Sequence, residues 1–456
     1  MGFFDNLLLN LPEVAPPKQK RLAFKEKLKW TLIVLILFYI LGLIELYGLG
    51  DAPLRQFEFL SVILGASFGS IISLGIGPIV TASIVLQLLN GSGLMKFDLT
   101  SHEGKQRFQG IQKLLSIFFI FFEAMIYVLF GGLSPAAGVP AGILIFQLFL
   151  GGMLILFMDE VVSKWGFGSG ISLFIAAGVA QNIFIRTFSP FKLGGTYSAG
   201  AIPALFQALA AQNPTEAGLR IASIAATIIV FLVVVYVQAM KVEIPLSFGR
   251  IRGHGIRWPL NFIYTSNIPV ILIAAFLANL QLFASILSRW NYPLGNPQTG
   301  TGIIGWLSAP GGQNGLVGLI IKNGTFMIGW EPYAKGLTYL LFFLGGSMLF
   351  SWFWVQTSGL DARSQAKQMM ASGLQIPGFR KDQRVLERLL ERYILPLTIM
   401  GGLAVGFLAA MADLSGALTS GTGLLLTVMI VYRLYEEIAQ QHVMDMNPMM
   451  RKFMGR

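Results

Sequence analysis

The 456-residue chain is 54% hydrophobic and only 12% charged, and its mean hydropathy is +0.67. A soluble protein of this length needs far more polar surface, so the composition excludes that class and indicates a polytopic membrane protein. Cysteine is absent, which excludes a disulfide framework and any thiolate nucleophile or metal ligand. In such a protein the formal net charge of +11 is interpreted first as a topology signal, before nucleic-acid binding is considered.

The first 27 residues form a polar N-terminal region. They contain the amphipathic stretch FFDNLLLNLPEV, and basic residues follow it. A mostly polar stretch of this kind lacks the apolar core of a cleavable signal peptide. We therefore expect residues 1–27 to be a cytoplasmic amphipathic N-terminus.

Ten apolar segments follow along the chain. Each is long enough, or nearly so, to cross a hydrocarbon core of about 30 Å. Glycines mark the starts of the fifth and tenth segments. The segments lie at about 28–48, 76–90, 111–130, 140–158, 169–188, 221–240, 262–287, 337–356, 393–412 and 417–436.

The apolar stretch that leads into the second segment is unusually long. Residues 57–89, FEFLSVILGASFGSIISLGIGPIVTASIVLQLL, are apolar almost without a break. As one helix they would extend roughly 50 Å, well beyond the thickness of a bilayer core. The Gly75-Ile76-Gly77-Pro78 cluster lies where a spanning segment would begin. We therefore expect an apolar half-helix that is separate from the span.

Basic residues are distributed unequally over the connections between these segments. With the N-terminus in the cytoplasm, 26 of the 33 Lys and Arg residues fall on the cytoplasmic side. The positive-inside rule therefore predicts that both termini and the basic loops 241–261 and 358–392 are cytoplasmic. The connections at about 189–220 and 288–336 are weakly charged and rich in Gly, Pro, Asn and Ser, so we predict that they are external.

The ten segments divide into two halves of five. An odd number in each half inverts the second half relative to the first, as in many transporters and channels. The second segment of each half contains a proline, in GIGPIV (75–80) and in SNIPVI (266–271). A single proline of this kind is explained by ordinary kinking of a membrane helix. Prolines that interrupt helices at corresponding positions in both halves indicate instead a pathway between the halves.

We therefore predict an all-α membrane protein with ten transmembrane helices in two inverted, pseudo-symmetric halves and a re-entrant half-helix. The expected parts after the N-terminus are a first half (28–190), an external loop (191–220), a second half (221–436) and a cytoplasmic tail (437–456).

Motifs typical of enzymes are incomplete in this chain. HEGKQ (102–106) begins like a zinc-binding helix, but Gln106 replaces the second histidine and we expect the motif to lie in a loop. GLGD (48–51) has no second buried aspartate to share a proton. The glycine pairs in GFGSGIS (166–172) and SGTGLLL (420–426) lack the lysine of a phosphate loop. We predict that the protein is not an enzyme and has no cofactor and no metal site.

One acidic and four aliphatic residues within the segments are candidates for function. Glu123 fits either a transporter's coupling site or a structural carboxylate paired with a neighbouring hydroxyl or amide. Ile76 and Val80, like Ile171 and Ile175, lie four residues apart and share a helix face. Such pairs fit core or lipid contact, and beside glycine-marked helix starts they also fit an apolar constriction.

Seven stretches, in this order along the chain, carry a resemblance to a known family. They are KEKLKW (25–30), LGIGPIVTASIVLQLL (74–89), FQGIQKLLSI (108–117), DEVVSKWGFGSGISLFIAAGVAQ (159–181), VEIPLSFGRIRG (242–253), SNIPVIL (266–272) and GTGLLLTVMIVYRLYE (421–436). Together they resemble the SecY family, the channel subunit of the Sec protein translocon, and archaeal members in particular. The connection 288–336 and the tail QHVMDMNPMMRKFMGR carry no such motif.

The resemblance implies a gated channel that moves unfolded polypeptides across a membrane and releases transmembrane segments into lipid. The half-helix at about 57–68 would be a plug seated against a pore ring. A lateral gate would lie between the second and third segments on one side and the seventh and eighth on the other. The implied residues are Phe57, Leu60, Ile63, Leu64 and Phe68 for the plug, Ile76, Val80, Ile171, Ile175, Ile271 and Leu426 for the ring, and Thr81, Glu123 and Asn279 for the gate.

The resemblance also implies partners and a location. The partners would be a single-span SecE-type gamma subunit, a beta subunit, the ribosome, nascent polypeptides with their signal sequences, and membrane lipid; the location would be the plasma membrane. Arg250, Arg252 and Arg380 would contact the ribosome, because basic side chains attract RNA phosphates. Positive-inside topology alone also explains much of that loop charge.

An inverted-repeat secondary transporter is the alternative function. It requires a site for a small solute and a coupling ion near the middle of the membrane. Solute uptake by the purified protein would support this alternative.

Cysteine labelling tests the predicted topology, because the chain has no native cysteine. Arg250→Cys and Arg380→Cys should react with a membrane-impermeant maleimide only from the cytoplasmic side, and Gly300→Cys only from outside. Labelling after permeabilisation controls for the reactivity of each site. External labelling of Arg250→Cys would overturn the assignment of the segments.

Overall fold

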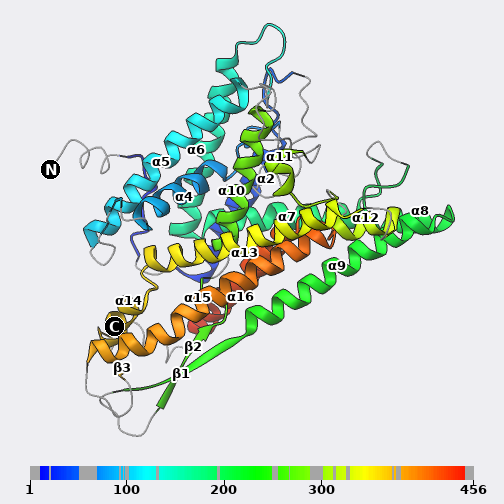
Figure 1. Ribbon diagram of the computed structural model, residues 1–456. Coiled ribbons are helices and arrows are strands. Elements are labelled where there is room, and N and C mark those ends of the chain that lie inside the picture. The colour runs from blue at the N-terminus through cyan, green and yellow to red at the C-terminus, as the bar shows by residue number, and fades with distance from the viewer. Residues whose placement is uncertain are drawn as a thin grey trace.

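The computed structural model is built mainly from α-helices (Figure 1). Each of the ten predicted apolar segments coincides with one helix, and the all-α prediction is confirmed. These helices are α2 (Phe24–Leu43), α4 (Gly77–Gly91), α5 (His102–Leu129), α6 (Ala141–Trp165), α7 (Gly170–Phe188), α9 (Pro214–Ala239), α10 (Ile268–Leu287), α13 (Glu331–Thr357), α15 (Gln383–Leu414) and α16 (Gly421–Met446). The structure describes residues 11–19, 22–50, 69–91, 94–95, 97, 102–129, 133–192, 196–248, 255–265, 268–287, 301–311, 315–324, 329–371, 374–375 and 382–446.

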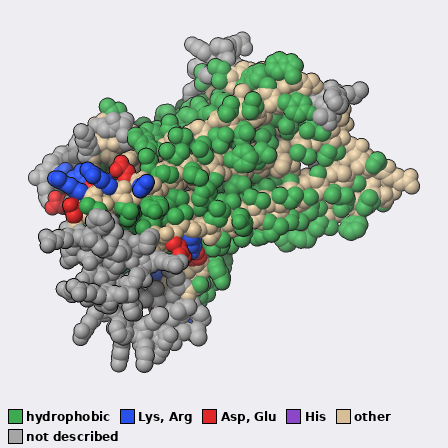
Figure 2. All heavy atoms as spheres, turned by 60° about the horizontal axis from the view of Figure 1, so that its bottom comes forward, with side chains coloured by type: hydrophobic (Ala, Val, Ile, Leu, Met, Phe, Trp, Pro, Cys, Tyr) green, Lys and Arg blue, Asp and Glu red, His purple; other side chains and the backbone are tan. Residues whose placement is uncertain are grey.

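Length and apolarity distinguish the helices within this described part. Helices α5, α6, α7, α9, α13 and α15 are long and apolar enough to cross a membrane, and α4 and α10 are shorter apolar helices. Helices α2 and α16 are long, but each carries charged residues at one end. Figure 2 shows hydrophobic side chains over most of the visible surface and charged side chains gathered at one end. Such an outer surface suits lipid contact.

Several connections that the sequence predicted as loops contain helices. The two connections predicted to be external hold α8 (Ala201–Ala210), α11 (Gly302–Trp306) and α12 (Gly315–Asn323), and the basic loop 358–392 holds α14 (Ala362–Ala371). Helix α9 begins at Pro214, inside the predicted loop 191–220. Helix α5 begins at His102, so the prediction that HEGKQ lies in a loop was wrong. Helices α8, α11, α12 and α14 were missed because they are short or polar.

Helix α15 also begins well before its predicted segment. Its buried residues Leu386, Leu390, Ile394 and Leu397 follow a helical period. Asp382 caps this early start by accepting the backbone N–H of Arg384 at 2.9 Å. Hydropathy alone missed this early part of α15 because charged residues separate the apolar ones.

A small antiparallel sheet joins the two basic loops. Strand β1 (Lys241–Phe248) pairs with β2 (Gly255–Asn261), with Lys241 opposite Asn261 and Ser247 opposite Gly255. On its other edge β1 pairs with β3 (Leu374–Gln375), which gives the order β2-β1-β3. The sequence predicted two separate loops here, and the structure shows one shared sheet.

A second hydrophobic core lies beneath this sheet. It is separate from the main core and is built from β1, β2, α13, α14 and α15. Its fully or nearly buried residues are Ile244, Leu260, Val355, Ala366, Met369, Leu386, Leu390, Ile394 and Leu397. The two basic loops are therefore packed as one unit.

The two halves of the chain meet in the main hydrophobic core. In Figure 1, α2, α4–α6 and α10 lie above α9, α13, α15 and α16, with α7 between them. Helix α7 packs on α16, and α10 packs on both α4 and α13. One core cluster consequently contains buried residues from both halves.

The N-terminal segment is fastened to the end of α6. Lys164 pairs with Glu13 and also donates to the carbonyl oxygen of Val14 at 2.6 Å, while the Trp165 indole donates to Ala15 at 3.0 Å. The Lys164 hydrogen bond holds the pKa of the Glu13 carboxyl below its usual value. This contribution to stability is present above the carboxyl pKa of the unfolded chain and is lost as pH falls through the lowered value.

Small residues bring α13 and α15 into close contact. Gly402 and Gly406 on α15 face Ser347 and Ser351 on α13, so both helices present small residues four positions apart. A Cβ added at Gly406 would lie 2.7 Å from the Phe343 carbonyl oxygen and 2.8 Å from Ser347 Oγ. Small-residue pairs of this kind let helix backbones approach closely in membranes.

Gly406→Ala should therefore destabilise the protein. The added methyl group meets backbone, so we expect a loss of about 1–3 kcal/mol from overpacking. Thermal unfolding in detergent micelles measures the change. Gly345→Ala, on α13, is the matched control, because a Cβ there meets nothing within 4 Å. Equal melting temperatures for the two variants would contradict the close packing.

Candidate functional site

Two proline-marked helix starts face the centre of the molecule. In α4, Val80 lies two positions after Pro78, and in α10, Ile271 lies two positions after Pro269. Gly75 has a φ of +56°, a left-handed conformation that glycine adopts without strain and that lets the chain turn into α4. The two halves therefore place an aliphatic side chain at matching positions.

All six residues predicted for the ring belong to one cluster. Ile76, Val80, Ile175 and Leu426 lie in the main core and are each at most 4% exposed. Ile171 and Ile271 are partly buried and pack against the same core. The structure thus brings together side chains from α7, α10 and α16 and from the start of α4. Their role as a pore ring remains a prediction.

A cavity of about 1640 Å³ reaches this cluster. Val80, Ile171 and Ile271 line it, whereas Ile76, Ile175 and Leu426 are buried beside them. The other end of the cavity is polar and is lined by exposed Lys105, Arg363 and Lys367. The cavity therefore passes from a charged rim to an aliphatic wall.

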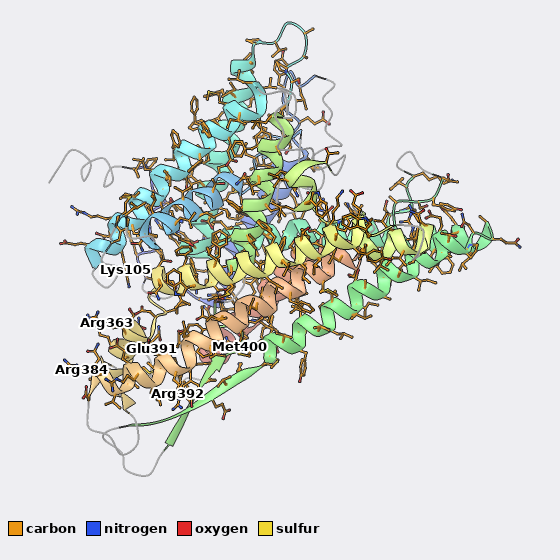
Figure 3. The ribbon with its side chains drawn as sticks, in the orientation of Figure 1. Lys105, Arg363, Arg384, Glu391, Arg392 and Met400 are labelled. Carbon is orange, nitrogen blue, oxygen red and sulfur yellow. The ribbon has the colours of Figure 1, made fainter. Side chains whose placement is uncertain are left out.

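The rim belongs to the end of the molecule where cations gather. Figure 3 shows Lys105 of α5, Arg363 of α14, and Arg384 and Arg392 of α15 at this end, together with Glu391. We call it the basic end. It also carries the three-stranded sheet.

A polar strip on α4, which the sequence did not lead us to predict, faces the cavity. Ser83, Gln87 and Asn90 form this strip on one face of α4 and line the cavity. Gln112 of α5 donates to Ser83 Oγ at 2.7 Å and fixes the strip against α5. Polar residues at helical spacing within TASIVLQLLN are the signal that could have found it.

The three residues predicted for the lateral gate form one hydrogen-bonded cluster. Asn279 of α10 donates to Thr81 Oγ1 of α4 at 2.9 Å. The Thr81 hydroxyl lies 3.2 Å from Glu123 Oε1 of α5 and 2.9 Å from the Gly77 carbonyl oxygen, either of which can accept its proton. Glu123 is 9% exposed. The cluster therefore links helices of the two halves, and its role as a gate remains a prediction.

The other predicted site residues lie outside the described residues. These are the plug residues Phe57, Leu60, Ile63, Leu64 and Phe68 and the ribosome-binding candidates Arg250, Arg252 and Arg380. Within the described ranges, no group of three or more His, Asp or Glu side chains is placed to hold a metal ion.

These features define a class of protein: an all-α, multi-pass membrane protein with a cavity that runs from a charged rim to aliphatic side chains between two halves. Comparison with known proteins agrees with that class. The SecY family model matches residues 70–435. The chain belongs to the SecY family.

Relatives and solved structures extend this similarity over nearly the whole chain. The protein translocase subunit SecY of Methanothermobacter thermautotrophicus is 46% identical over 462 residues, which cover 99% of this chain and 98% of the relative. A solved structure described as that of a protein conducting channel has a TM-score of 0.82 and 42% identity, with 96% of each chain covered. Sec61 in a canine ribosome-channel complex from the endoplasmic reticulum has a TM-score of 0.79 and 41% identity, again with 96% of each chain covered.

A double-mutant cycle tests the polar link between the halves. Thr81→Val and Asn279→Leu should show a coupling energy of about 0.6–1.7 kcal/mol in thermal unfolding, the range for hydrogen bonds between membrane helices. Gln281→Leu is the control partner for Thr81→Val, because the Gln281 amide donates to Ser308 Oγ instead. Additive effects for Thr81 and Asn279 would mean that their hydrogen bond contributes nothing.

Proposed function

We propose that this chain is a protein-conducting channel, which moves unfolded polypeptides across the membrane and releases transmembrane segments sideways into lipid. The observation that carries the proposal is the aliphatic cluster at the end of the cavity. The translocase relatives and the likeness to a protein conducting channel support it. The chain does this work without catalysis, as a passive pore driven by a bound partner.

The six aliphatic residues are proposed to act as a seal. Side chains without charge or hydrogen-bonding groups offer an ion no replacement for its hydration shell, and a narrow apolar constriction excludes water. Aliphatic side chains also adapt to a passing polypeptide whatever its sequence, because they impose no hydrogen-bond geometry. Ile76, Val80, Ile171, Ile175, Ile271 and Leu426 form this ring.

The apolar stretch at 57–68 is proposed as a plug that supports the ring. It is too apolar for a water-exposed loop, and together with α4 it is too long for one span. A stretch of this kind is stable when its Phe, Leu and Ile side chains are buried, and each fully buried side chain contributes about 1.5–3 kcal/mol. The entropic cost of ordering the chain reduces that total, which suits a segment that must move.

The lateral gate is proposed to open between α4 and α5 on one side and α10 and α13 on the other. A transmembrane segment that leaves the channel needs a seam in the wall. Thr81, Glu123 and Asn279 are the polar contacts across this seam. Hydrogen bonds between membrane helices are individually weak, at about 0.6 kcal/mol on average, so the seam can separate without loss of the fold.

Partners and orientation complete the proposal. The basic end is proposed to face the cytoplasm of a plasma membrane, with both termini on that side. Arg250, Arg252 and Arg380 are proposed to contact the ribosome, since their loops share the sheet and the second core at that end. A SecE-type gamma subunit and a beta subunit are proposed as further partners, with signal sequences and lipid at the gate.

Ion conductance in planar bilayers tests the seal. Deleting residues 57–68 should leave a folded channel that leaks intermittently, and serine at all six ring positions should add a sustained leak by wetting the constriction. Val80→Ile and Ile175→Leu together are the control, because they keep the ring aliphatic. A plug-deleted, ring-polar channel as ion-tight as wild type would refute the gating proposal.

A further inference from the structure

Two aspartates occupy corresponding places in the two halves. Asp159 lies near the end of α6, the helix before α7, and Asp413 lies near the end of α15, the helix before α16. Each carboxylate accepts an N–H from the first turn of the next helix. Asp159 Oδ1 accepts from Ile171 at 2.9 Å, and Asp413 Oδ1 accepts from Gly421 at 2.6 Å.

Both contacts depend on a glycine at the helix start. A Cβ added at Gly170 would lie 2.6 Å from the Cα of Asp159, and one added at Gly421 would lie closer still to the backbone nitrogen of Asp413. No side chain fits in either place. Helices α7 and α16 therefore each begin in direct contact with the preceding helix that carries the aspartate.

The two sites differ in what supports the aspartate. In α7, Ser169 makes no side-chain cap of its own, and its hydroxyl lies 3.5 Å from Asp159 Oδ1. In α16, Ser420 Oγ accepts the Gly423 N–H at 3.2 Å, and Asp413 Oδ2 accepts the Tyr339 hydroxyl of α13 at 2.7 Å. An aspartate from the preceding helix is the element common to both.

The ring residues share a fixed relation to these contacts. Ile175 and Leu426 lie the same number of positions after the glycine that begins each helix. The two helices run antiparallel, because Gly168, just before α7, is close to Leu434 in the middle of α16, whereas Gly423 near the start of α16 is close to Val179 in the middle of α7. The two aspartates consequently hold the α7–α16 pair at opposite ends.

We propose that Asp159 and Asp413 are positioning residues that set the register of α7 and α16 at the constriction. Each carboxylate accepts a backbone N–H that has no partner within its own helix. The negative charge of the carboxylate is also stabilised by the positive end of the helix dipole at that point. Loss of either contact lets the helix start shift and moves Ile171 and Ile175, or Leu426, out of the ring. The proposal rests on the proposed function of the ring as a seal.

Conductance in planar bilayers provides the first test. Asp159→Ala and Asp413→Ala should each raise the frequency of leak events by about tenfold, which corresponds to about 1.4 kcal/mol and lies within the range for a lost helix cap. Asp159→Asn and Asp413→Asn should restore a tight channel, because the amide oxygen still accepts the N–H. Asp382→Ala is the matched control, since Asp382 caps α15, which carries no ring residue.

Glycine variants provide a second test that leaves both carboxylates in place. Gly170→Ala and Gly421→Ala force the helix start away from the aspartate and should leak like the alanine variants. Gly142→Ala in α6 should stay tight, because a Cβ there meets nothing within 4 Å. Gel filtration and circular dichroism identify the variants that fold. If the aspartate variants do not fold, the two glycine variants test the proposal.

The outcomes separate this inference from the function on which it rests. If the ring-polar variant leaks but folded Asp→Ala and Gly→Ala variants are as tight as wild type, the positioning role of Asp159 and Asp413 is refuted and the ring is still supported. Leak of Asp382→Ala equal to that of Asp159→Ala would also refute them, as would failure of the Asn variants to restore tightness. If the ring-polar variant itself stays tight, the proposed seal fails.

Discussion

The backbone N–H groups at helix starts are the constraint on which the centre of this molecule depends. The first turn of any helix has N–H groups without partners in that helix, and such groups are costly away from water. The candidate ring residues lie at or near the starts of α4, α7, α10 and α16. The arrangement that gathers aliphatic side chains therefore also gathers unpaired polar backbone. The carboxylates of Asp159 and Asp413 accept N–H groups at the starts of α7 and α16, so these groups are paired without a polar side chain in the ring.

A helix contact within the second half and a helix contact between the two halves differ in kind. Between α13 and α15, Gly402 and Gly406 meet Ser347 and Ser351, so the two backbones approach closely at this point. Between α4 and α10, the described polar link is the Asn279–Thr81 hydrogen bond. Small residues let helix backbones pack closely, whereas a hydrogen bond between helices is weak because its groups find other partners when the helices separate. The molecule thus combines a fixed contact with a separable one.

Sequence reasoning found the helices and singled out the aliphatic pairs because those signals are local, whereas most of the other candidate residues came from the family resemblance. A run of apolar residues long enough to span a membrane is easily detected, and each of the ten segments coincides with a helix. Helix α15 starts early because Leu386 and Leu390 keep a helical period among charged residues, which average hydropathy conceals. The cavity-lining strip of Ser83, Gln87 and Asn90 was missed for a similar reason. The β-sheet was beyond such reasoning, because β1 and β3 are far apart in sequence and β3 has only two residues.

The sheet has a consequence for the order in which the chain folds during synthesis. Strands β1 and β2 are neighbours in sequence and can pair as soon as residue 261 has been made, but the edge of β1 that receives β3 stays open until residue 375 exists. The second core is likewise incomplete until Leu386 and Leu390 arrive. Helices α10, α13 and α14 are therefore all synthesised while this strand edge is still uncovered and the second core is still incomplete. An exposed edge of this kind pairs readily with other strands, and β3 later covers only two residue pairs of it.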